Sequence, residues 1–130
     1  MNSDVQNVSD LIPILCPDHS QTFFNTTFQE SYHSKVGAIL EAKHKFINPC
    51  EDILKNSQNK KIKILDPFFG LGYNTGMALD LAYKSCKNPY IEIIAIEKDI
   101  EIIKATFFSN LGKVENHTCL KFKNYLNFFA

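Results

Sequence analysis

Three glycines and two acidic residues in the middle of the chain are the first candidates for chemistry. The segment "ILDPFFGLGYNTG" (64–76) places Asp66 after a short apolar run and glycines at Gly70, Gly72 and Gly76. A strand that enters a helix through glycines turns sharply and lets a ligand approach the first helical N–H groups. The pattern is G-x-G-x-x-x-G, whereas dinucleotide-binding folds favour G-x-G-x-x-G and phosphate-binding loops need Gly-Lys-Ser/Thr. We therefore predict a nucleoside ligand that carries no pyrophosphate.

Glu97 is the second acidic candidate, and it ends the clearest strand pattern in the chain, "YIEIIAIEKD" (90–99). The carboxyl ends of neighbouring parallel strands lie side by side, so Glu97 is expected beside the glycine loop, where it would accept hydrogen bonds from both ribose hydroxyls of a nucleoside. Asp66, at the end of the preceding strand, suits a cation such as the ammonium or sulfonium of S-adenosylmethionine. Asn74, which opens the next helix, is expected to bond the carboxylate of this donor or to fix the loop. Each feature alone also fits a tight turn or a helix cap, but their order and spacing together favour a nucleoside site.

The elements that must position these residues alternate between helix and strand. Alternation of this kind implies parallel strands with helical crossovers, and therefore an α/β fold. The near-continuous apolar run in 90–99 predicts a strand covered on both faces. The first half is expected to hold a flexible polar arm (1–12), one or two short strands (21–28), a helix with Ser34 as N-cap that Pro49 ends, and a short helical end with a basic turn (51–61). The second half is expected to hold a strand in "KIKILDPF" that ends at Asp66-Pro67, a helix (74–87) ended by Asn88-Pro89, and the strand 90–99. A last helix is capped by Asp99 and stopped by Gly112, with Ile103, Phe107 and Leu111 on one stripe.

The composition bounds the possible partners and sites. The 130 residues suit one domain, and the 14 basic and 14 acidic residues balance, so any contact with a nucleic acid must come from a local patch such as "KNSQNKKIK", which a solvated turn also explains. No apolar run reaches the roughly 20 residues that span a bilayer, and the polar start "MNSDVQNVSD" is unlike a secretory signal, which makes a cytoplasmic protein the expectation. The four cysteines are widely spaced, so no metal site is expected.

Four blocks of residues resemble one family. The chain is similar to the bacterial methyltransferases that finish 5-methylaminomethyl-2-thiouridine at the wobble position of tRNA, whose pattern reads roughly D-G-S-x-T, F-x-E-x-Y-H-S, G-A-x-x-E-A and F-G-x-G-x-N. The match covers about residues 17 to 99, and His19 stands where the family usually has glycine. The matching residues are Asp18, Ser20 and Thr22; Phe28, Glu30, Tyr32, His33 and Ser34; Gly37, Ala38, Glu41 and Ala42; and Phe69, Gly70, Gly72 and Asn74.

The resemblance implies a class I, Rossmann-like methyltransferase sheet, here extending to the second core strand and its helix, so that 13–130 is a partial methyltransferase domain. Within it, 13–50 holds the N-terminal strands and helix, 61–112 the donor-binding βαβα core, and 113–130 an unassigned tail. S-adenosylmethionine is the implied methyl donor, and tRNA carrying a 5-aminomethyl group is the implied substrate. The acidic strand end that lies near the reacting amine in the family has no counterpart, so the catalytic base stays unassigned. The expected donor-binding residues are Asp66, Phe69, Gly70, Gly72, Asn74 and Glu97, together with Tyr32 and Glu41 from the resemblance.

Two other functions stay open at this point. The chain could be a non-catalytic nucleoside-binding or interaction fragment, which donor binding without methyl transfer would indicate. A nicotinamide-dependent oxidoreductase is disfavoured because the third glycine comes one residue late and the Y-H-S and E-A blocks have no role there. A short α/β sheet also leaves an exposed edge and an apolar face, which predicts self-association.

Overall fold

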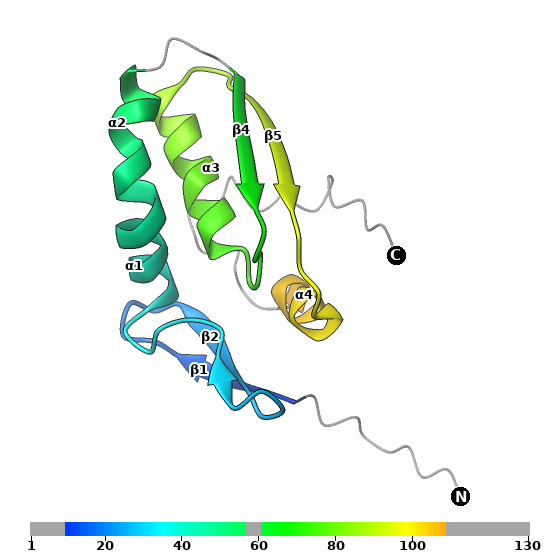
Figure 1. Ribbon diagram of the computed structural model, residues 1–130. Coiled ribbons are helices and arrows are strands. Elements are labelled where there is room, and N and C mark those ends of the chain that lie inside the picture. Colours follow the sequence, from blue (N-terminus) through cyan, green and yellow to red (C-terminus); the bar gives the residue numbers. More distant parts are fainter. Residues whose placement is uncertain (1–9, 57–60, 109–130) are drawn as a thin grey trace, which may run out of the picture.

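A computed structural model describes residues 10–56 and 61–108, and its helices and strands form an α/β arrangement with two small sheets (Figure 1). One sheet is antiparallel with strand order β1-β2-β3, and the other is a parallel pair, β4-β5. In chain order the elements are β1 (Leu11–Leu15), β2 (Gln21–Asn25), β3 (Glu30–Ser31), α1 (Ala38–Ala42), the π-helical turn η1 (Lys43–Ile47), α2 (Asn48–Asn56), β4 (Lys61–Asp66), α3 (Tyr73–Ser85), β5 (Tyr90–Ala95) and α4 (Ile100–Phe108).

The N-terminal sheet is a hairpin with a short third strand. β1 pairs with β2 in the register Leu11↔Asn25 to Leu15↔Gln21, and β3 adds to the other edge of β2. The prediction of a short strand within 21–28 is confirmed by β2. The predicted arm, however, includes Leu11 and Ile12, which belong to β1; residues 1–9 lie outside the described part of the chain.

The helix after the hairpin differs from its prediction at both ends. Gly37, not Ser34, is the N-cap of α1, and the helix passes through Pro49 and ends at Asn56. Proline is tolerated here because the preceding turn is π-helical: the Asn48 N–H donates to the Lys43 carbonyl, five residues back, so the backbone hydrogen bonds shift just where Pro49 lacks a donor.

The predicted strand–loop–helix–strand unit is present. β4 and β5 are parallel, in the register Lys61↔Tyr90 to Asp66↔Ala95, and α3 packs on β4. Two elements end earlier than predicted: α3 ends at Ser85, before Asn88-Pro89, and β5 ends at Ala95, before Glu97. The link between the strands extends one step further, because the Ile96 N–H donates to the Asp66 carbonyl at 2.9 Å.

The expectation that this strand is covered on both faces is wrong for the described residues. α3 lies on one face of the β4–β5 pair, with α2 beyond it (Figure 1). Residues on the opposite face, such as Leu65 and Ile94, are exposed. Its amino end carries charge, with Glu92 3.9 Å from both Lys61 and Lys63. Its carboxyl end is apolar and exposes Leu65, Ile94 and Ile96.

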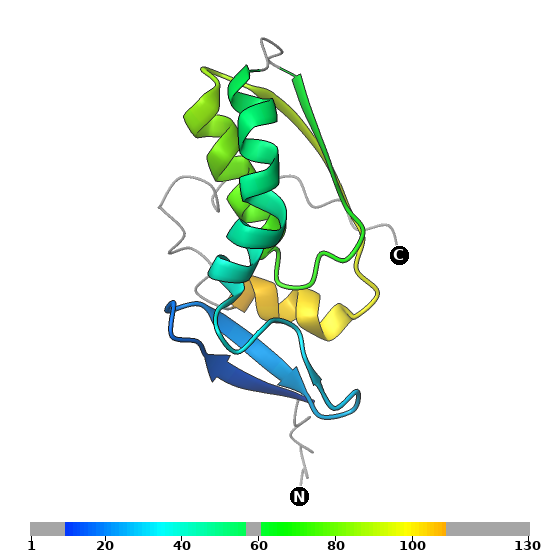
Figure 2. The ribbon, with the colours of Figure 1, turned by 60° about the vertical axis from the view of Figure 1, so that its left-hand side comes forward.

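α4 lies between the hairpin and the carboxyl ends of β4 and β5, as both ribbon views show (Figure 2). The core joins these parts and contains Leu11, Ala38, Ala42, Leu71, Tyr73 and Ile102. The predicted stripe is displaced, because Ile102 is fully buried and Ile103 only partly. The Phe107 side chain, Leu111 and Gly112 lie outside the description. In the described residues, no helix has the length and apolar character needed to cross a membrane.

Candidate functional site

The loop from β4 to α3 uses its two glycines in different ways. Gly72 is the N-cap of α3 with φ 78°, and a Cβ added there would lie 2.6 Å from Cζ of Phe69, so ring packing excludes a side chain. Gly70 also has a left-handed backbone, with φ 53°, but an added Cβ would meet its nearest atoms only at 4.0 Å. Gly76 is an ordinary residue of α3 with open space around it, so the predicted third glycine takes no part in the loop geometry.

Glu97 turns its carboxylate onto this loop. Its Oε2 accepts the Gly70 N–H at 2.8 Å, and its Oε1 accepts the Asp99 N–H at 2.9 Å. An ionised carboxylate offers about four lone-pair positions, so about two remain for a ligand. The helix cap is a different residue, as predicted: Oδ1 of Asp99 accepts the Glu101 N–H at 3.0 Å at the start of α4. The Glu97 carboxylate is therefore a hydrogen-bond acceptor held in place beside the Gly70 backbone, which carries no side chain.

Asp66 and Phe69 form the buried floor of the loop. Asp66 is 7% exposed, and its Oδ2 accepts a hydrogen bond from Oγ1 of the buried Thr75 at 2.6 Å. Phe69 is buried, and its N–H donates to the Ile96 carbonyl at 3.0 Å, which ties the loop to the exit of β5. Asn74 lies half-buried in the first turn of α3, next to Thr75. The structure thus brings six of the predicted donor-binding residues to one end of the sheet: Asp66, Phe69, Gly70, Gly72, Asn74 and Glu97.

Tyr32 joins the hairpin to this loop. Its hydroxyl donates to Oδ2 of Asp99 and receives a 3.4 Å hydrogen bond from Nδ2 of Asn25. Its ring edge lies 4.0 Å from the position of a Cβ on Gly70. Burial and the hydrogen bond to Asp99 raise the pKa of Tyr32 to about 12, so the phenol stays protonated at neutral pH.

Glu41 lies elsewhere in the described structure. Its carboxylate accepts the Ser34 N–H at 2.7 Å and binds Nζ of Lys45 at 2.6 Å. The hydrogen bond from Lys45 is the main cause that lowers the pKa of Glu41. These contacts hold the start of α1 and the segment before it, so the described contacts do not bring Glu41 to the glycine loop.

Asp18 has a structural role that local patterns did not predict. Its Oδ2 accepts the Leu40 N–H at 3.0 Å, and its Oδ1 accepts from the N–H and Oγ of Ser20, whose Oγ in turn accepts the Ala38 N–H at 2.8 Å. Burial alone would raise the pKa of Asp18, but these hydrogen bonds outweigh it and lower the pKa. The D-x-S block thus caps α1 from 18 or more residues away; only its match to the family pattern singled it out in the sequence.

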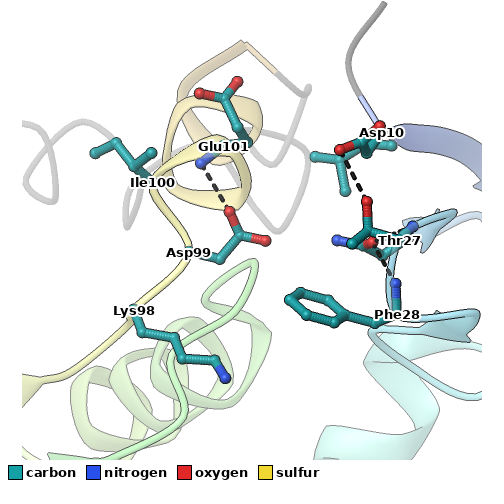
Figure 3. Close-up of a pocket in the computed structure, with 9 residues that line it drawn as sticks. Asp10, Thr27, Phe28, Lys98, Asp99, Ile100 and Glu101 are labelled. Carbon is teal, nitrogen blue, oxygen red and sulfur yellow. Dashed lines mark hydrogen bonds between the residues drawn. The ribbon is translucent and has the colours of Figure 1, made fainter.

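A cleft of about 390 Å³ opens between the hairpin and the start of α4 (Figure 3). Asp99 borders it, and Lys98 places Nζ 5.6 Å from the centre of the Phe28 ring, which is 57% exposed. Its lining residues are Asp10, Leu11, Asn25, Thr27, Phe28, Lys98, Asp99, Ile100 and Glu101. The sequence did not predict this cleft, because it exists only where segments far apart in the chain meet. Among the described residues, no group of three His, Cys, Asp or Glu side chains is arranged to hold a metal ion.

Comparison with solved structures finds MnmC2 from Aquifex aeolicus, with 30% sequence identity, a TM-score of 0.64, and coverage of 87% of this chain and 41% of that chain. The resemblance to the wobble-uridine methyltransferase family is confirmed. The predicted α/β class is confirmed with it, and β4, the glycine loop, α3 and β5 form a parallel β-α-β unit. The chain spans about two fifths of the length of MnmC2. No protein-family model and no curated protein gives a significant match.

Proposed function

We propose that this chain binds S-adenosylmethionine at the glycine loop, beside Gly70 and Glu97, and that it serves the methylation of a 5-aminomethyl group on the wobble uridine of tRNA. The likeness to MnmC2 at 30% identity is the observation that carries this proposal. The loop geometry supports it, because the carboxylate of Glu97 faces main chain at a glycine that leaves space around it.

The residues at the glycine loop fit such a donor. The remaining acceptor positions of Glu97 suit a ribose diol, since two backbone N–H groups already fix the carboxylate and no reorganisation is needed. Asp66 places a buried carboxyl group at the loop for the cationic part of the ligand, and the Thr75 hydroxyl orients it. Gly70 leaves room for close approach of the ligand to the backbone. When bound, the donor would supply a methyl group made electrophilic by its sulfonium.

The proposed work of the described residues is to hold and orient the donor. Displacement at a methyl group depends mainly on keeping donor and amine in line, and orientation of this kind lowers the barrier substantially. We assign Asp66, Gly70, Asn74 and Glu97 to donor binding, Phe69 and Gly72 to the shape of the loop, and none of them to proton transfer. tRNA is the proposed macromolecular partner, and the cytoplasm is the proposed location because tRNA is modified there.

Calorimetry with S-adenosylhomocysteine tests donor binding. Glu97→Gln should weaken binding by about 10- to 100-fold, because a charged acceptor of two ribose hydroxyls is replaced by a neutral amide with a single oxygen. Glu92→Gln is the matched control: Glu92 lies within β5 on its exposed face, whereas Glu97 follows the end of that strand, so this variant should bind the ligand like the unaltered protein.

Methyl incorporation into tRNA that carries the aminomethyl group then tests the reaction. Donor binding without turnover would favour the non-catalytic nucleoside-binding alternative. Absence of donor binding by the unaltered chain would contradict the proposed function as a whole.

We also propose self-association through the exposed face of β4 and β5. Leu65, Ile94 and Ile96 are each more than half exposed at its carboxyl end, and the neighbouring Phe68 is 85% exposed. Contiguous apolar surface of this kind marks contact sites in proteins. Size-exclusion chromatography with light scattering should show a dimer or larger species that Leu65→Lys converts to monomer; a monomer at all concentrations would contradict this part.

A further inference from the structure

Tyr32, Asp99, Glu97 and Gly70 form a closed ring of contacts at the glycine loop. The Tyr32 hydroxyl donates to the Asp99 carboxylate, and the Asp99 N–H donates to Oε1 of Glu97 at 2.9 Å. The Gly70 N–H donates to Oε2 of Glu97 at 2.8 Å. The ring closes where the Tyr32 side chain lies beside Gly70. The proposed ribose acceptor is thus linked by hydrogen bonds to Tyr32 through Asp99.

We propose that Tyr32 and Asp99 are a positioning pair for the donor site. The phenol holds the Asp99 side chain, and Asp99 fixes the Glu97 carboxylate through its own backbone N–H. Tyr32 therefore acts on the sugar of the ligand without touching it, which differs from the direct contact that the family resemblance implied. This inference rests on the proposed function and adds the means by which its acceptor is held.

The hairpin is able to impose this position because Tyr32 is itself anchored. Its N–H, just after β3, donates to the Phe23 carbonyl of β2 at 3.0 Å, and Nδ2 of Asn25 donates to its hydroxyl. The phenol remains a donor throughout the neutral range, since burial raises the pKa of Tyr32 to about 12. A hydrogen bond from a neutral phenol to a carboxylate is charge-assisted and among the stronger kinds.

The Asp99 carboxylate serves two partners at once. Oδ1 caps α4 through the Glu101 N–H, and Oδ2 receives the Tyr32 hydroxyl. If Asp99 were a helix cap and nothing more, removal of the phenol oxygen would leave α4 and Glu97 as they are. If the pair positions the site, the same removal loosens the turn between Glu97 and Asp99 while the cap persists.

Amide hydrogen exchange on the full chain without ligand separates these two cases. Tyr32→Phe should speed exchange at Gly70 and Asp99 several-fold, because their common acceptor Glu97 loses its fixed position. The amides of β5 should exchange as before. Tyr90→Phe is the matched control, since Tyr90 lies exposed at the far end of the parallel sheet and should change neither Gly70 nor Asp99. Unchanged exchange at both amides in Tyr32→Phe would overturn the inference.

Calorimetry with S-adenosylhomocysteine shows whether the effect passes through Glu97. Tyr32→Phe should weaken binding by about 5- to 10-fold, and Glu97→Gln by more. The double variant should bind no more weakly than Glu97→Gln alone, because the phenol has nothing left to position. Additive losses would contradict a route through Glu97. If the unaltered chain does not bind the ligand but Tyr32→Phe still speeds exchange, the proposed function is contradicted, while the positioning of Glu97 by Tyr32 and Asp99 is supported.

Discussion

Asp18 and Glu97 are two carboxylates that reach across the fold to backbone N–H groups, and each lies against a glycine. At the first, a Cβ added to Gly37 would lie 2.0 Å from Oδ2 of Asp18. At the second, a Cβ added to Gly70 would meet no atom of the described neighbourhood closer than 4.0 Å. Both glycines have positive φ, 151° and 53°. The first glycine makes room for a side chain of the protein, whereas the second leaves room that no described side chain fills.

The difference also appears in how fully each carboxylate is used. Asp18 accepts two hydrogen bonds from Ser20 and one from the Leu40 N–H, which uses most of the capacity of its two oxygens. From the described residues, Glu97 accepts two hydrogen bonds, which use about half of its capacity. A satisfied carboxylate stabilises the fold, and a fixed but partly unsatisfied one is suited to a ligand. The comparison therefore distinguishes a carboxylate that holds the fold from the carboxylate that we propose binds the ligand.

Substitution of the two glycines should give the largest contrast. Gly37→Ala forces a methyl group into the Asp18 carboxylate at a positive φ, and should destabilise the protein by roughly 2–4 kcal/mol. Gly70→Ala meets open space and should cost about 1 kcal/mol from its left-handed backbone alone. Urea unfolding followed by circular dichroism measures both values.

Donor affinity should reverse this order. Gly70→Ala places a methyl group where we propose that the ligand approaches the backbone. It should therefore weaken S-adenosylhomocysteine binding much more than Gly37→Ala does in its folded fraction. Equal stability losses for the two variants, or equal affinities, would remove the distinction between the two glycines.

Asp18→Asn should give a smaller effect that depends on pH. The pKa of Asp18 is lowered in the folded state, so the ionised side chain stabilises the protein above its ordinary pKa, and this contribution is lost as the pH falls through the lowered value. At pH 6, Asp18→Asn should cost about 1–2 kcal/mol, the usual worth of a helix cap. Thermal melts between pH 6 and pH 3 should show a steeper loss for the unaltered protein than for the variant; parallel curves would mean that Asp18 contributes no ionised cap.

His19→Gly should give the smallest effect and the opposite sign. His19 has φ 65° in the turn between β1 and β2, a conformation that costs a side chain about 1 kcal/mol and glycine almost nothing. The larger freedom of glycine in the unfolded chain offsets part of that gain, so the net stabilisation should be a few tenths of a kcal/mol. A chemical-denaturation midpoint that falls rather than rises would show that the His19 side chain contributes contacts of its own.

Local sequence patterns were sufficient to predict the part of the candidate site that is formed by residues close together in the sequence. The β4–loop–α3–β5 unit follows from apolar runs, glycine spacing and a strand-ending acid. The position of Glu97 beside Gly70 then follows from parallel pairing alone. Asp99 as the cap of α4 was readable for the same reason, since an N-cap depends on the next few residues.

Features that depend on distant contacts were not predictable in this way. Ser34 looked like an N-cap, but Asp18 and Ser20 satisfy the first turn of α1 from another segment, so the helix begins at Gly37 instead. Pro49 looked like a helix end, yet the π-helical turn before it lets the helix continue. The apolar run in β5 indicated cover on both faces, although Ile94 is 57% exposed. In each case tertiary context overrode a sound local rule.

A crystal structure of the chain with S-adenosylhomocysteine tests the central claim most directly. The account predicts both ribose hydroxyls within hydrogen-bonding distance of the Glu97 carboxylate, with the Gly70 N–H still bonded to it and the ligand passing over Gly70. A ligand bound in the cleft beside Phe28 with Glu97 uninvolved, or a ribose held by other residues, would contradict it.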